Sequence, residues 1–312
     1  MTTQANKVAI VTGASGGIGA AVAERLAKDG FTVVVNYAGS AVSAQAVVAR
    51  IEAAEGRAAA AQADISDVAA VARMFDSAET AFGGVDVLIN NAGIMAIPRL
   101  TTKDGFETQI GTNHLGHFAL TGLLIGRLVE SAPSRVVTVS SMAHTMGKFR
   151  ALDANDLLLQ TGYTKWGAYG RSKLANLLFA YELERRLETR FSSVLSVACH
   201  PGYAATNLQA VGPQMTNSTL EKAFMSIGNA VLAQSAAAGA LPTLYAATAP
   251  DVRGGDYIGP GGPFKMIGAP VKQKSNRASH DTQAASKLWE TSVTLTGVDF
   301  ELLRPETPRA AM

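Results

Sequence analysis

The stretch that decides the fold is Val8-Ala9-Ile10-Val11-Thr12-Gly13-Ala14-Ser15-Gly16-Gly17-Ile18-Gly19, near the start of the chain. Its first four residues are apolar and predict a buried strand, and the following segment, Gly17–Lys28, has the apolar periodicity of a helix. Glycines between a strand and a helix let the backbone turn tightly and approach a pyrophosphate, whose charge then lies at the N-terminus of the helix. The stretch therefore predicts a nucleotide-binding turn, although a turn that only closes a helix onto a strand fits the same residues.

Two other motifs compete for these glycines. Gly13, Gly17 and Gly19 form G-x-x-x-G-x-G, and no Gly-Lys-Ser/Thr follows at the spacing that a P-loop requires. Gly13 to Gly17 also match G-x-S-x-G, the turn that carries the nucleophilic serine of α/β-hydrolases. That turn stands on a sheet of several preceding strands, whereas only one strand precedes Ser15. A hydrolase that uses Ser15 is therefore the least favoured interpretation.

Short β-branched runs alternate with longer helical segments as far as about residue 250, which predicts a parallel sheet, doubly wound, with helices on both faces. We expect strands at Val8–Val11, Thr32–Asn36, Ala58–Gln62, Asp86–Asn90, Arg135–Ser140, Val194–His200 and Asp256–Ile258. We expect helices at Gly17–Lys28, Ser43–Glu55, Val68–Phe82, Phe106–Glu130, Tyr169–Leu187 and Leu220–Ala249, the last broken near Gly239 and Pro242. Residues 1–260 then form the main domain. Residues 261–312 form a C-terminal extension packed on it, irregular at first and helical around Asp281–Glu290.

Composition excludes several classes of protein. The 312 residues are 47% apolar and 17% charged and include one cysteine, so neither a disordered chain nor a disulfide scaffold fits. The 27 Lys and Arg nearly balance the 25 Asp and Glu, which gives no support for nucleic-acid binding. The single cysteine and the lack of a signal peptide before Val8 predict a cytoplasmic protein. The uncharged segment Ala223–Pro250 contains too many polar residues for a membrane span and favours a buried or subunit-facing helix pair.

Polar residues follow the later strands, at the edge of the sheet where ligands bind in such folds. Asn90-Asn91-Ala92-Gly93 follows the fourth strand, Ser140-Ser141 the fifth, and His200-Pro201-Gly202 the sixth. Tyr169 and Lys173 are four positions apart, which places both side chains on one face of a helix. An ammonium group close to a phenol lowers the pKa of the phenol toward working pH. Taken alone, the same spacing is usual in an amphipathic helix whose lysine reaches solvent.

Together with T-G-x-x-x-G-x-G, this series of motifs resembles the short-chain dehydrogenase/reductase family over about residues 6 to 260. The resemblance implies an α/β protein with a single-domain Rossmann fold and a doubly wound parallel sheet of about seven strands. It implies an NAD(P)(H)-dependent oxidoreductase that interconverts a carbonyl and a primary or secondary alcohol. The alternative is a protein of the same fold that binds NADP(H) as a sensor without catalysis. The tyrosine and lysine pair favours the enzyme, because a sensor has no chemical need for it.

The resemblance assigns four catalytic residues. Tyr169 is the general acid and base, and Lys173 assists it while holding the ribose hydroxyls of the nicotinamide nucleotide. Ser141 hydrogen-bonds the substrate oxygen and is preferred to Ser140, because the serine of the family is the second of such a pair. Asn113 corresponds to the helix asparagine that supports a proton-relay water.

The resemblance also predicts the cofactor contacts, which are Gly13, Ser15, Gly17, Ile18, Gly19, Asn36, Tyr37, Ser40, Asp64, Ile65, Asn91, Ala92, Gly93, Tyr169, Lys173, Pro201, Gly202 and Thr206. An acidic residue at the end of the second strand would hydrogen-bond the ribose 2′-hydroxyl of NAD. Asn36, Tyr37 and Ser40 stand there instead, so no carboxylate opposes a 2′-phosphate and NADP(H) is favoured over NAD(H). Gly16 weakens the preference for NADP(H), because many NADP-dependent relatives carry a basic residue at this position. Asp64 matches the residue that meets the adenine amino group, although a helix cap explains it nearly as well.

Two branches of the family contribute to the resemblance. The C-terminal half, with His144 and Phe149 between Ser141 and Tyr169, is similar to retinol dehydrogenases, whereas the N-terminal part is similar to 3-oxoacyl-acyl-carrier-protein reductases. The segment Tyr203–Ile227 corresponds to the substrate lid of the family. Apolar side chains in this segment and near the expected pocket predict a hydrophobic carbonyl or alcohol substrate, although core packing explains each of them about as well; they are Met95, Met142, Met146, Tyr163, Trp166, Leu208, Met215, Leu220, Phe224, Met225 and Ile227.

His114 and His117 share a helix face, but no second cluster completes a coordination shell, so we expect no metal site. Cys199 lies within a predicted strand and reads as a small buried residue. Members of the family commonly form dimers or tetramers, and the uncharged segment Ala223–Pro250 could serve such assembly. The extension could equally block it, so a homo-oligomer stays an open alternative.

Overall fold

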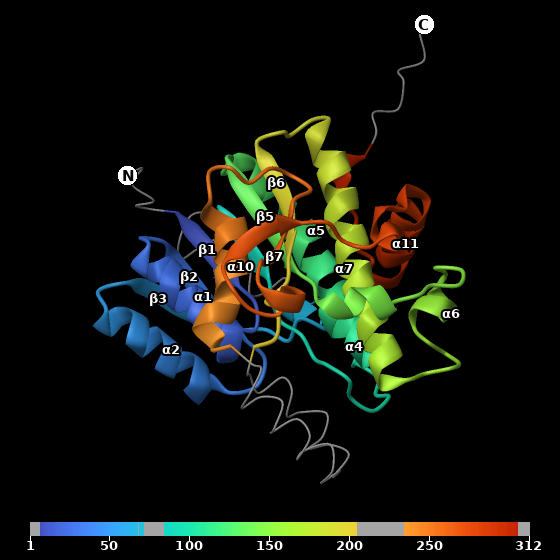
Figure 1. Ribbon diagram of the computed structural model, residues 1–312, viewed down its shortest axis with the longest axis horizontal. Coiled ribbons are helices and arrows are strands. Elements are labelled where there is room, and N and C mark those ends of the chain that lie inside the picture. Colours follow the sequence, from blue (N-terminus) through green and yellow to red (C-terminus); the bar gives the residue numbers. More distant parts are fainter. Residues whose placement is uncertain (1–6, 68, 72–83, 205–233, 305–312) are drawn as a thin grey trace, which may run out of the picture.

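The computed structural model describes residues 7–67, 69–71, 84–204 and 234–304, which build one eight-stranded sheet with helices on both faces (Figure 1). The strands are β1 Val8–Val11, β2 Thr32–Tyr37, β3 Arg57–Gln62, β4 Val87–Asn90, β5 Ser134–Val139, β6 Val194–Cys199, β7 Tyr257–Pro260 and β8 Pro270–Gln273. Their order is β3-β2-β1-β4-β5-β6-β7-β8, and all neighbours are parallel except β7 and β8. The expected doubly wound parallel sheet is confirmed, with eight strands where about seven were expected.

The helices follow the expected alternation with the strands. The α-helices are α1 Gly17–Lys28, α2 Ala41–Ala53, α4 Thr108–Ile110, α5 Gly116–Glu130, α6 Ala154–Leu157, α7 Lys165–Glu188, α10 Ala236–Thr248 and α11 Thr282–Thr296. The shorter helices are the π-helix η1 Gly111–Leu115 and the 3₁₀-helices η2 Met142–Met146, η3 Pro263–Lys265, η4 Arg277–His280 and η5 Glu301–Leu303. The helix expected over Val68–Phe82 lies outside the described residues except for 69–71, and so does the first part of the one expected over Leu220–Ala249.

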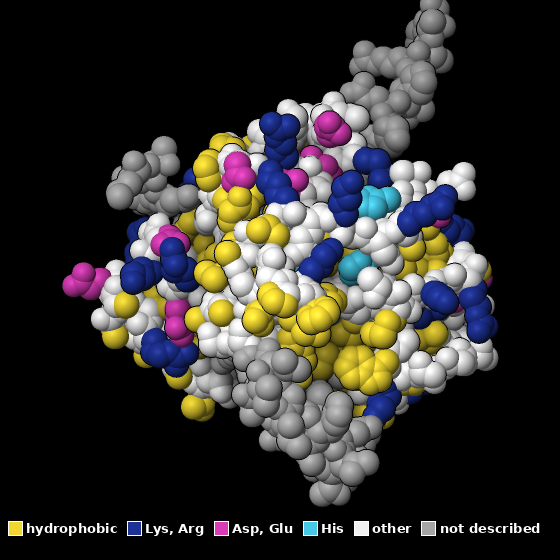
Figure 2. Space-filling model, in the orientation of Figure 1, with side chains coloured by type: hydrophobic (Ala, Val, Ile, Leu, Met, Phe, Trp, Pro, Cys, Tyr) yellow, Lys and Arg dark blue, Asp and Glu magenta, His cyan; other side chains and the backbone are white. Residues whose placement is uncertain are grey.

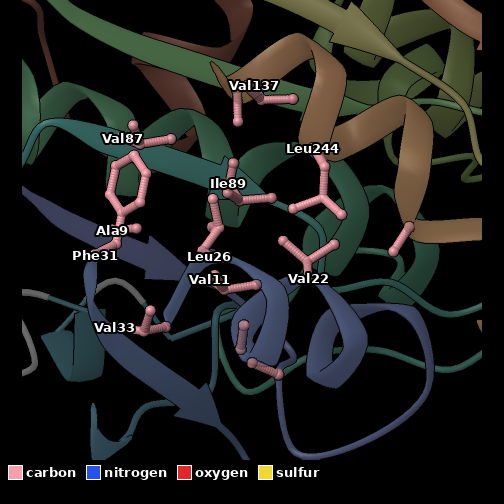
Figure 3. Packing of buried hydrophobic residues seen from close by; sticks show 14 of the residues in the cluster. Ala9, Val11, Val22, Leu26, Phe31, Val33, Val87, Ile89, Val137 and Leu244 are labelled. Atoms are coloured by element: carbon pink, nitrogen blue, oxygen red, sulfur yellow. The ribbon is translucent and has the colours of Figure 1, made fainter. Parts of the chain in front are cut away.

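Each face of the sheet has its own hydrophobic core, because successive side chains of a strand point to opposite faces. Val11 of β1 lies in one core with Leu244 of α10, which Figure 3 shows above the β1–α1 unit. Ile10, the preceding residue, lies in the other core with Phe118 of α5. Every residue of Val8–Val11 is buried, as expected for a strand covered on both sides.

α10 runs without interruption through Gly239 and Pro242, where the sequence predicts a break. That prediction was wrong because Gly239 serves close packing: a Cβ atom added there would lie 2.8 Å from Ala204 Cβ and 3.4 Å from Ile18 Cδ1. Pro242 removes one helical hydrogen bond, and the burial of this helix against α1 and the sheet offsets that loss.

The chain after residue 260 adds a strand and a helix. β8 pairs antiparallel with β7, so the expectation of irregular chain there was wrong. The reason is that β7 offers an open edge for pairing, which local sequence does not report. α11 is longer than the predicted Asp281–Glu290 and ends at Gly297, whose φ of +68° is the left-handed conformation typical of helix ends. Trp289 of α11 packs against Phe118, with ring centroids 5.1 Å apart. The division of the chain at residue 260 stays a prediction.

Candidate active site

The glycine-rich turn after β1 meets the polar turn after β4. Between these two strands the order of the sheet changes: β2 and β3 lie on one side of β1, and β4 and the later strands lie on the other. Asn91 Nδ2 donates a hydrogen bond to Thr12 O over 2.8 Å, which ties the two turns together. Gly13 has a φ of +63°, and a Cβ atom there would lie 2.8 Å from Ala92 Cα. A Cβ atom on Gly19 would lie 2.4 Å from Gly13 O. The glycines are therefore required by backbone conformation and close approach, as the sequence predicts.

The first turn of α1 presents its amide groups beside this junction. Gly16 occupies the N-cap position with extended backbone, and no described side chain accepts a hydrogen bond from the first turn there. Ser15 and Ile18 are half-buried on either side, whereas Gly16 and Gly17 are exposed. Unsatisfied amide groups at a helix N-terminus bind anions well. The arrangement fits a pyrophosphate group.

Asn36, at the end of β2, turns its side chain inward. Its Oδ1 accepts a hydrogen bond from Gly13 N over 3.2 Å, and its Nδ2 donates to Ala63 O over 3.1 Å. Only 1% of its surface is exposed. Asn36 therefore shapes the glycine turn, while Tyr37 is also buried and Ser40 is exposed at the N-cap of α2. Of the three residues expected to face a ribose, Ser40 is the one that the described structure leaves open to solvent.

Asp64 and Ile65 lie after β3, beside the same edge of the sheet. Asp64 Oδ1 accepts hydrogen bonds from Ser66 N over 2.9 Å and from Ser66 Oγ over 2.8 Å, so it closes a local turn. The helix cap is Asp67, whose Oδ1 accepts a hydrogen bond from Ala70 N over 3.0 Å, so the interpretation of Asp64 as a helix cap was wrong. The carboxylate of Asp64 is nevertheless exposed. Ile65 is buried against α5, where a Cβ atom on Gly116 would lie 1.9 Å from Ile65 O.

Tyr169 and Lys173 lie one turn apart on α7, and both are buried, with 5% and 4% of their surfaces exposed. Lys173 Nζ lies 5.9 Å from the centre of the Tyr169 ring and donates a hydrogen bond to Val139 O over 3.1 Å. Ser141, at the N-cap of η2, has its hydroxyl group close enough to Tyr169 to lower the pKa of the phenol. Three residues of the predicted catalytic set are therefore grouped in one place.

The fourth member, Asn113, lies in the π-helix η1, and π turns occur frequently at functional sites. Its Oδ1 accepts a hydrogen bond from Ile94 N over 2.8 Å, and its Nδ2 donates to Ile94 O over 3.0 Å and to Ser172 Oγ over 2.8 Å. Gly93 faces both Asn113 and Lys173: a Cβ atom on it would lie 3.1 Å from Asn113 Oδ1 and 3.6 Å from Lys173 Nζ. A glycine at this position leaves room between the two functional groups.

Burial controls the protonation of the two central groups. It lowers the pKa of Lys173 to about 8. It also raises the pKa of Tyr169 above the usual value of 10.0, and the nearby hydroxyl group of Ser141 only partly opposes that effect. The sequence predicts that Lys173 lowers the pKa of Tyr169, whereas in the structure desolvation of the phenol outweighs the other influences. Tyr169 therefore stays protonated at neutral pH.

Sequence reasoning missed a buried connection between the two halves of the site. Thr12 Oγ1 accepts hydrogen bonds from Asn91 N and Ala92 N over 2.8 Å and 2.9 Å, and it lies 2.9 Å from His117 Nε2. His117 Nδ1 lies 3.1 Å from Asn113 O, which it can reach only as a donor. Burial lowers the pKa of His117 to about 4, so the ring is neutral. The four-residue spacing of Asn113 and His117 was the available signal, whereas His117 was considered only together with His114, as a possible metal ligand.

The segment after β6 completes the site as far as the structure describes it. Gly202 has a φ of +71°, and a Cβ atom on it would lie 2.1 Å from Met266 O. Its amide group lies 3.2 Å from His200 Nδ1, and Pro201 and Gly202 are both half-buried. Thr206 and the predicted lid from residue 205 to 227 lie outside the described residues.

Hydrophobic side chains gather on one face of the molecule, between the turn after β7 and the N-terminal end of α7 (Figure 2). Exposed apolar residues in these segments include Trp166, which is 46% exposed and contacts Tyr169 with ring centroids 6.2 Å apart, and Phe264, which is 83% exposed. The side chain of Tyr163, in contrast, is held by a hydrogen bond that its hydroxyl group donates to Ile97 O over 2.8 Å. This face is therefore apolar close to the predicted general acid.

Within the described ranges, no group of three or more His, Cys, Asp or Glu side chains could hold a metal ion. Across residues 7–67, 69–71, 84–204 and 234–304, no helix combines the length and the apolar character needed to cross a bilayer. Cys199 is buried in β6, and burial raises the pKa of its thiol to about 12.

Comparison with known proteins adds independent information. The model of the family described as short chain dehydrogenase matches residues 7–152. Retinol dehydrogenase 13 of Homo sapiens is 36% identical over 96% of this chain and 87% of its own. Polyprenol dehydrogenase of Mus musculus is 38% identical over 94% of this chain and 85% of its own. A solved structure of a short chain dehydrogenase from Burkholderia cenocepacia J2315, in complex with NADP, has a TM-score of 0.64 and 30% identity over 82% of this chain and 96% of that one.

Proposed function

Because the chain belongs to the short-chain dehydrogenase family and is an oxidoreductase acting on CH–OH groups, we propose that it interconverts a hydrophobic alcohol and its carbonyl with NADP(H). The observation that carries the proposal is the grouping of the Ser141 hydroxyl group, close enough to lower the pKa of Tyr169, with the buried phenol of Tyr169 and with Lys173 one turn along the same helix. A protonated phenol beside a second hydroxyl donor is suited to protonating a carbonyl oxygen.

In the proposed reduction, Tyr169 donates its proton to the carbonyl oxygen, and Ser141 hydrogen-bonds that oxygen as negative charge develops on it. Tyr169 becomes a phenolate when it gives up its proton. Lys173 stabilises this negative charge, because its buried ammonium group is close to the ring. When bound, the nicotinamide nucleotide would supply the hydride for reduction and take it up in oxidation. In oxidation, Tyr169 takes the proton back from the alcohol.

The residues of the turn fit a dinucleotide. The uncapped first turn of α1 would hold the pyrophosphate, and the left-handed conformations of Gly13 and Gly17 keep the backbone close to it. The absence of an acidic residue from Asn36 to Ser40 in the sequence supports NADP(H) over NAD(H). The similar structure that contains NADP supports the same choice. Asn36 itself would act indirectly, through the turn that it shapes.

The substrate class is supported by two observations. The described surface beside Tyr169 carries the exposed apolar side chains of Met146 and Trp166, which are 49% and 46% exposed. The relatives include proteins named retinol dehydrogenase and polyprenol dehydrogenase. An apolar alcohol or aldehyde with a long hydrocarbon chain would gain free energy by covering such side chains. The cytoplasmic location and any assembly into oligomers stay predictions.

The test is a matched substrate panel. The purified chain is given NADPH or NADH with retinal, a polyprenyl aldehyde, a short aliphatic aldehyde and a charged 2-oxo acid, and kcat/KM is measured for each pair. We expect the highest values for NADPH with the two long apolar aldehydes. A preference for the charged acid would refute the substrate class, and a clear preference for NADH would refute the choice of cofactor. Turnover of none of the carbonyls or of the matching alcohols with NADP would refute the activity.

A further inference from the structure

We infer that His144 is a positioning residue that fixes the main chain of Ser141 and is itself held by the C-terminal extension. The inference rests on the proposed function, because Ser141 has a catalytic role only there. His144 lies in η2, three residues after Ser141, and 5% of its surface is exposed. Its side chain hydrogen-bonds the backbone of Ser141 and not the side chain of Ser141, so it acts through another residue.

One ring nitrogen holds Ser141. His144 Nδ1 lies 2.6 Å from Ser141 O, and the same oxygen also accepts a hydrogen bond from His144 N over 3.0 Å. A carbonyl oxygen can only accept, so Nδ1 carries the proton and donates it. The short separation and the two donors fix the peptide group of Ser141.

The other ring nitrogen faces the extension. Asn276 N donates a hydrogen bond to His144 Nε2 over 3.2 Å, across 132 positions of the sequence. A backbone amide can only donate, so Nε2 carries no proton. The two contacts therefore specify one neutral tautomer of His144. Burial lowers the pKa of His144, the hydrogen bond to Ser141 only partly opposes this effect, and the nearby charge of Lys265 adds to it, which agrees with a neutral ring.

The extension presents Asn276 in a fixed position. Asn276 Oδ1 caps η4 by accepting a hydrogen bond from Ser279 N over 3.1 Å, and Asn276 Nδ2 donates to His144 O over 3.4 Å. On another side, the ring of Tyr257 in β7 contacts His144 edge-on, with centroids 5.8 Å apart. His144 is therefore held by β7 and by the segment that follows β8.

The consequence concerns the reaction step more than the binding of the cofactor. Ser141 has to direct one hydroxyl group toward Tyr169 and toward the substrate oxygen, and a misplacement of about 1 Å in such a contact can cost about 100-fold in rate. The glycine turn that would hold the cofactor belongs to β1 and α1, away from η2 in the sequence. Loosening Ser141 should therefore lower kcat and leave the affinity for NADPH unchanged.

Two substitutions separate the two ring nitrogens. The side-chain amide of asparagine reaches about as far as Nδ1, so His144→Asn keeps a donor for Ser141 O and loses the acceptor for Asn276 N. Glutamine reaches about as far as Nε2, so His144→Gln keeps the acceptor for Asn276 and loses the donor for Ser141. Thr291→Val is the control: it removes a different hydrogen bond of the extension, from Thr291 Oγ1 to Leu152 O over 2.7 Å.

We expect kcat with the best aldehyde to fall about tenfold or more in His144→Gln and to stay within about threefold of wild type in His144→Asn and Thr291→Val. The Kd for NADPH, measured by its fluorescence, should stay within about twofold in all three. Equal losses in the two His144 variants would overturn the inference, because the ring volume and not the bond would then matter. Unchanged kcat in His144→Gln would overturn it as well.

A second measurement does not depend on any variant folding. ¹⁵N NMR of chain labelled at histidine reports which ring nitrogen of His144 carries the proton, and we expect Nδ1. A proton on Nε2 would overturn the inference even if the variants lose activity. If the wild-type chain turns over no substrate, the proposed function fails first. If the wild type is fully active and His144→Gln has the same kcat, the proposed function stands and only the role of His144 is refuted.

Discussion

Asn113 Nδ2 donates a hydrogen bond to Ser172 Oγ over 2.8 Å, although 59 positions separate the two residues. Ser172 in turn donates to Tyr169 O over 2.8 Å. The bond joins the π turn η1 to the helix that carries Tyr169 and Lys173, so it sets the distance between two parts of the candidate site. Three of the four groups predicted to act in catalysis, Asn113, Tyr169 and Lys173, are thereby held on two joined helices, as precise positioning requires.

Replacing Ser172 by alanine should loosen this attachment. The buried Asn113 amide loses one acceptor, so we expect the free energy of unfolding to fall by about 1 kcal/mol and kcat to fall several-fold. Urea unfolding and steady-state kinetics measure the two effects. Thr248→Val is the matched control, because it removes the bond from Thr248 Oγ1 to Leu244 O in α10. Equal losses of kcat in both variants would contradict the role given to Ser172.

Tyr169→Phe should abolish turnover and spare the cofactor site. Loss of a general acid typically lowers the rate by about 10²- to 10⁴-fold. The Kd for NADPH should change little, because the glycine turn is untouched. Tyr181→Phe is the control on the same helix, since the Tyr181 hydroxyl bonds Ser275 of the extension over 2.8 Å. Stopped-flow hydride transfer distinguishes the two variants, and undiminished transfer in Tyr169→Phe would refute the mechanism.

Gly19→Ala should weaken cofactor binding. The added methyl group would lie 2.4 Å from Gly13 O and 2.6 Å from Asn91 Nδ2, so the two turns must separate. Overpacking of this kind costs about 1–3 kcal/mol, which corresponds to roughly a fivefold to 140-fold loss of affinity if the whole cost falls on the cofactor-bound state. Gly126→Ala on α5 is the control, with its nearest contact at 3.8 Å from Leu302 Cδ1. NADPH titration by fluorescence would contradict the prediction if both variants bound equally well.

Stability should fall as the pH drops from about 6.5 toward 4. Burial lowers the pKa of His114 to about 3, and those of His117 and His200 to about 4. These pKa values lie below the pKa of a histidine in the unfolded chain. At pH values between the folded-state pKa and the unfolded-state pKa, the unfolded chain therefore binds protons that the folded chain does not. Each group removes at most about 1.4 kcal/mol per pH unit in that window, and stability is retained above it.

Urea unfolding at a series of pH values between neutral and mildly acidic measures this dependence. His114→Gln should unfold with a shallower pH dependence than wild type, because one of the three groups is removed. The histidine ring of His114 bonds Ser292 Oγ over 2.9 Å, so the variant is compared by slope and not by absolute stability. A wild-type free energy of unfolding that is constant over the window would contradict the three lowered pKa values.

Local patterns in the sequence predicted the sheet and the glycine turn well. The strand Val8–Val11 and the helix Gly17–Lys28 were predicted with the boundaries that the structure has, because apolar runs and glycines report burial and turns locally. The edge strand β8 was missed because four residues, Pro-Val-Lys-Gln, form a strand only when β7 lies beside them. The π turn around Asn113 likewise depends on contacts with Ile94 and Ser172, which are distant in sequence.

The sequence by itself determined the order of strands and helices, the nucleotide-binding turn and the spacing of Tyr169 and Lys173, because these depend on neighbouring residues. Only the tertiary structure decided that Asn36 points inward, that the phenol of Tyr169 keeps a raised pKa, and that Asn276 reaches His144. Those properties depend on which side chains lose water and which distant atoms meet, and such quantities exist only once the chain has folded.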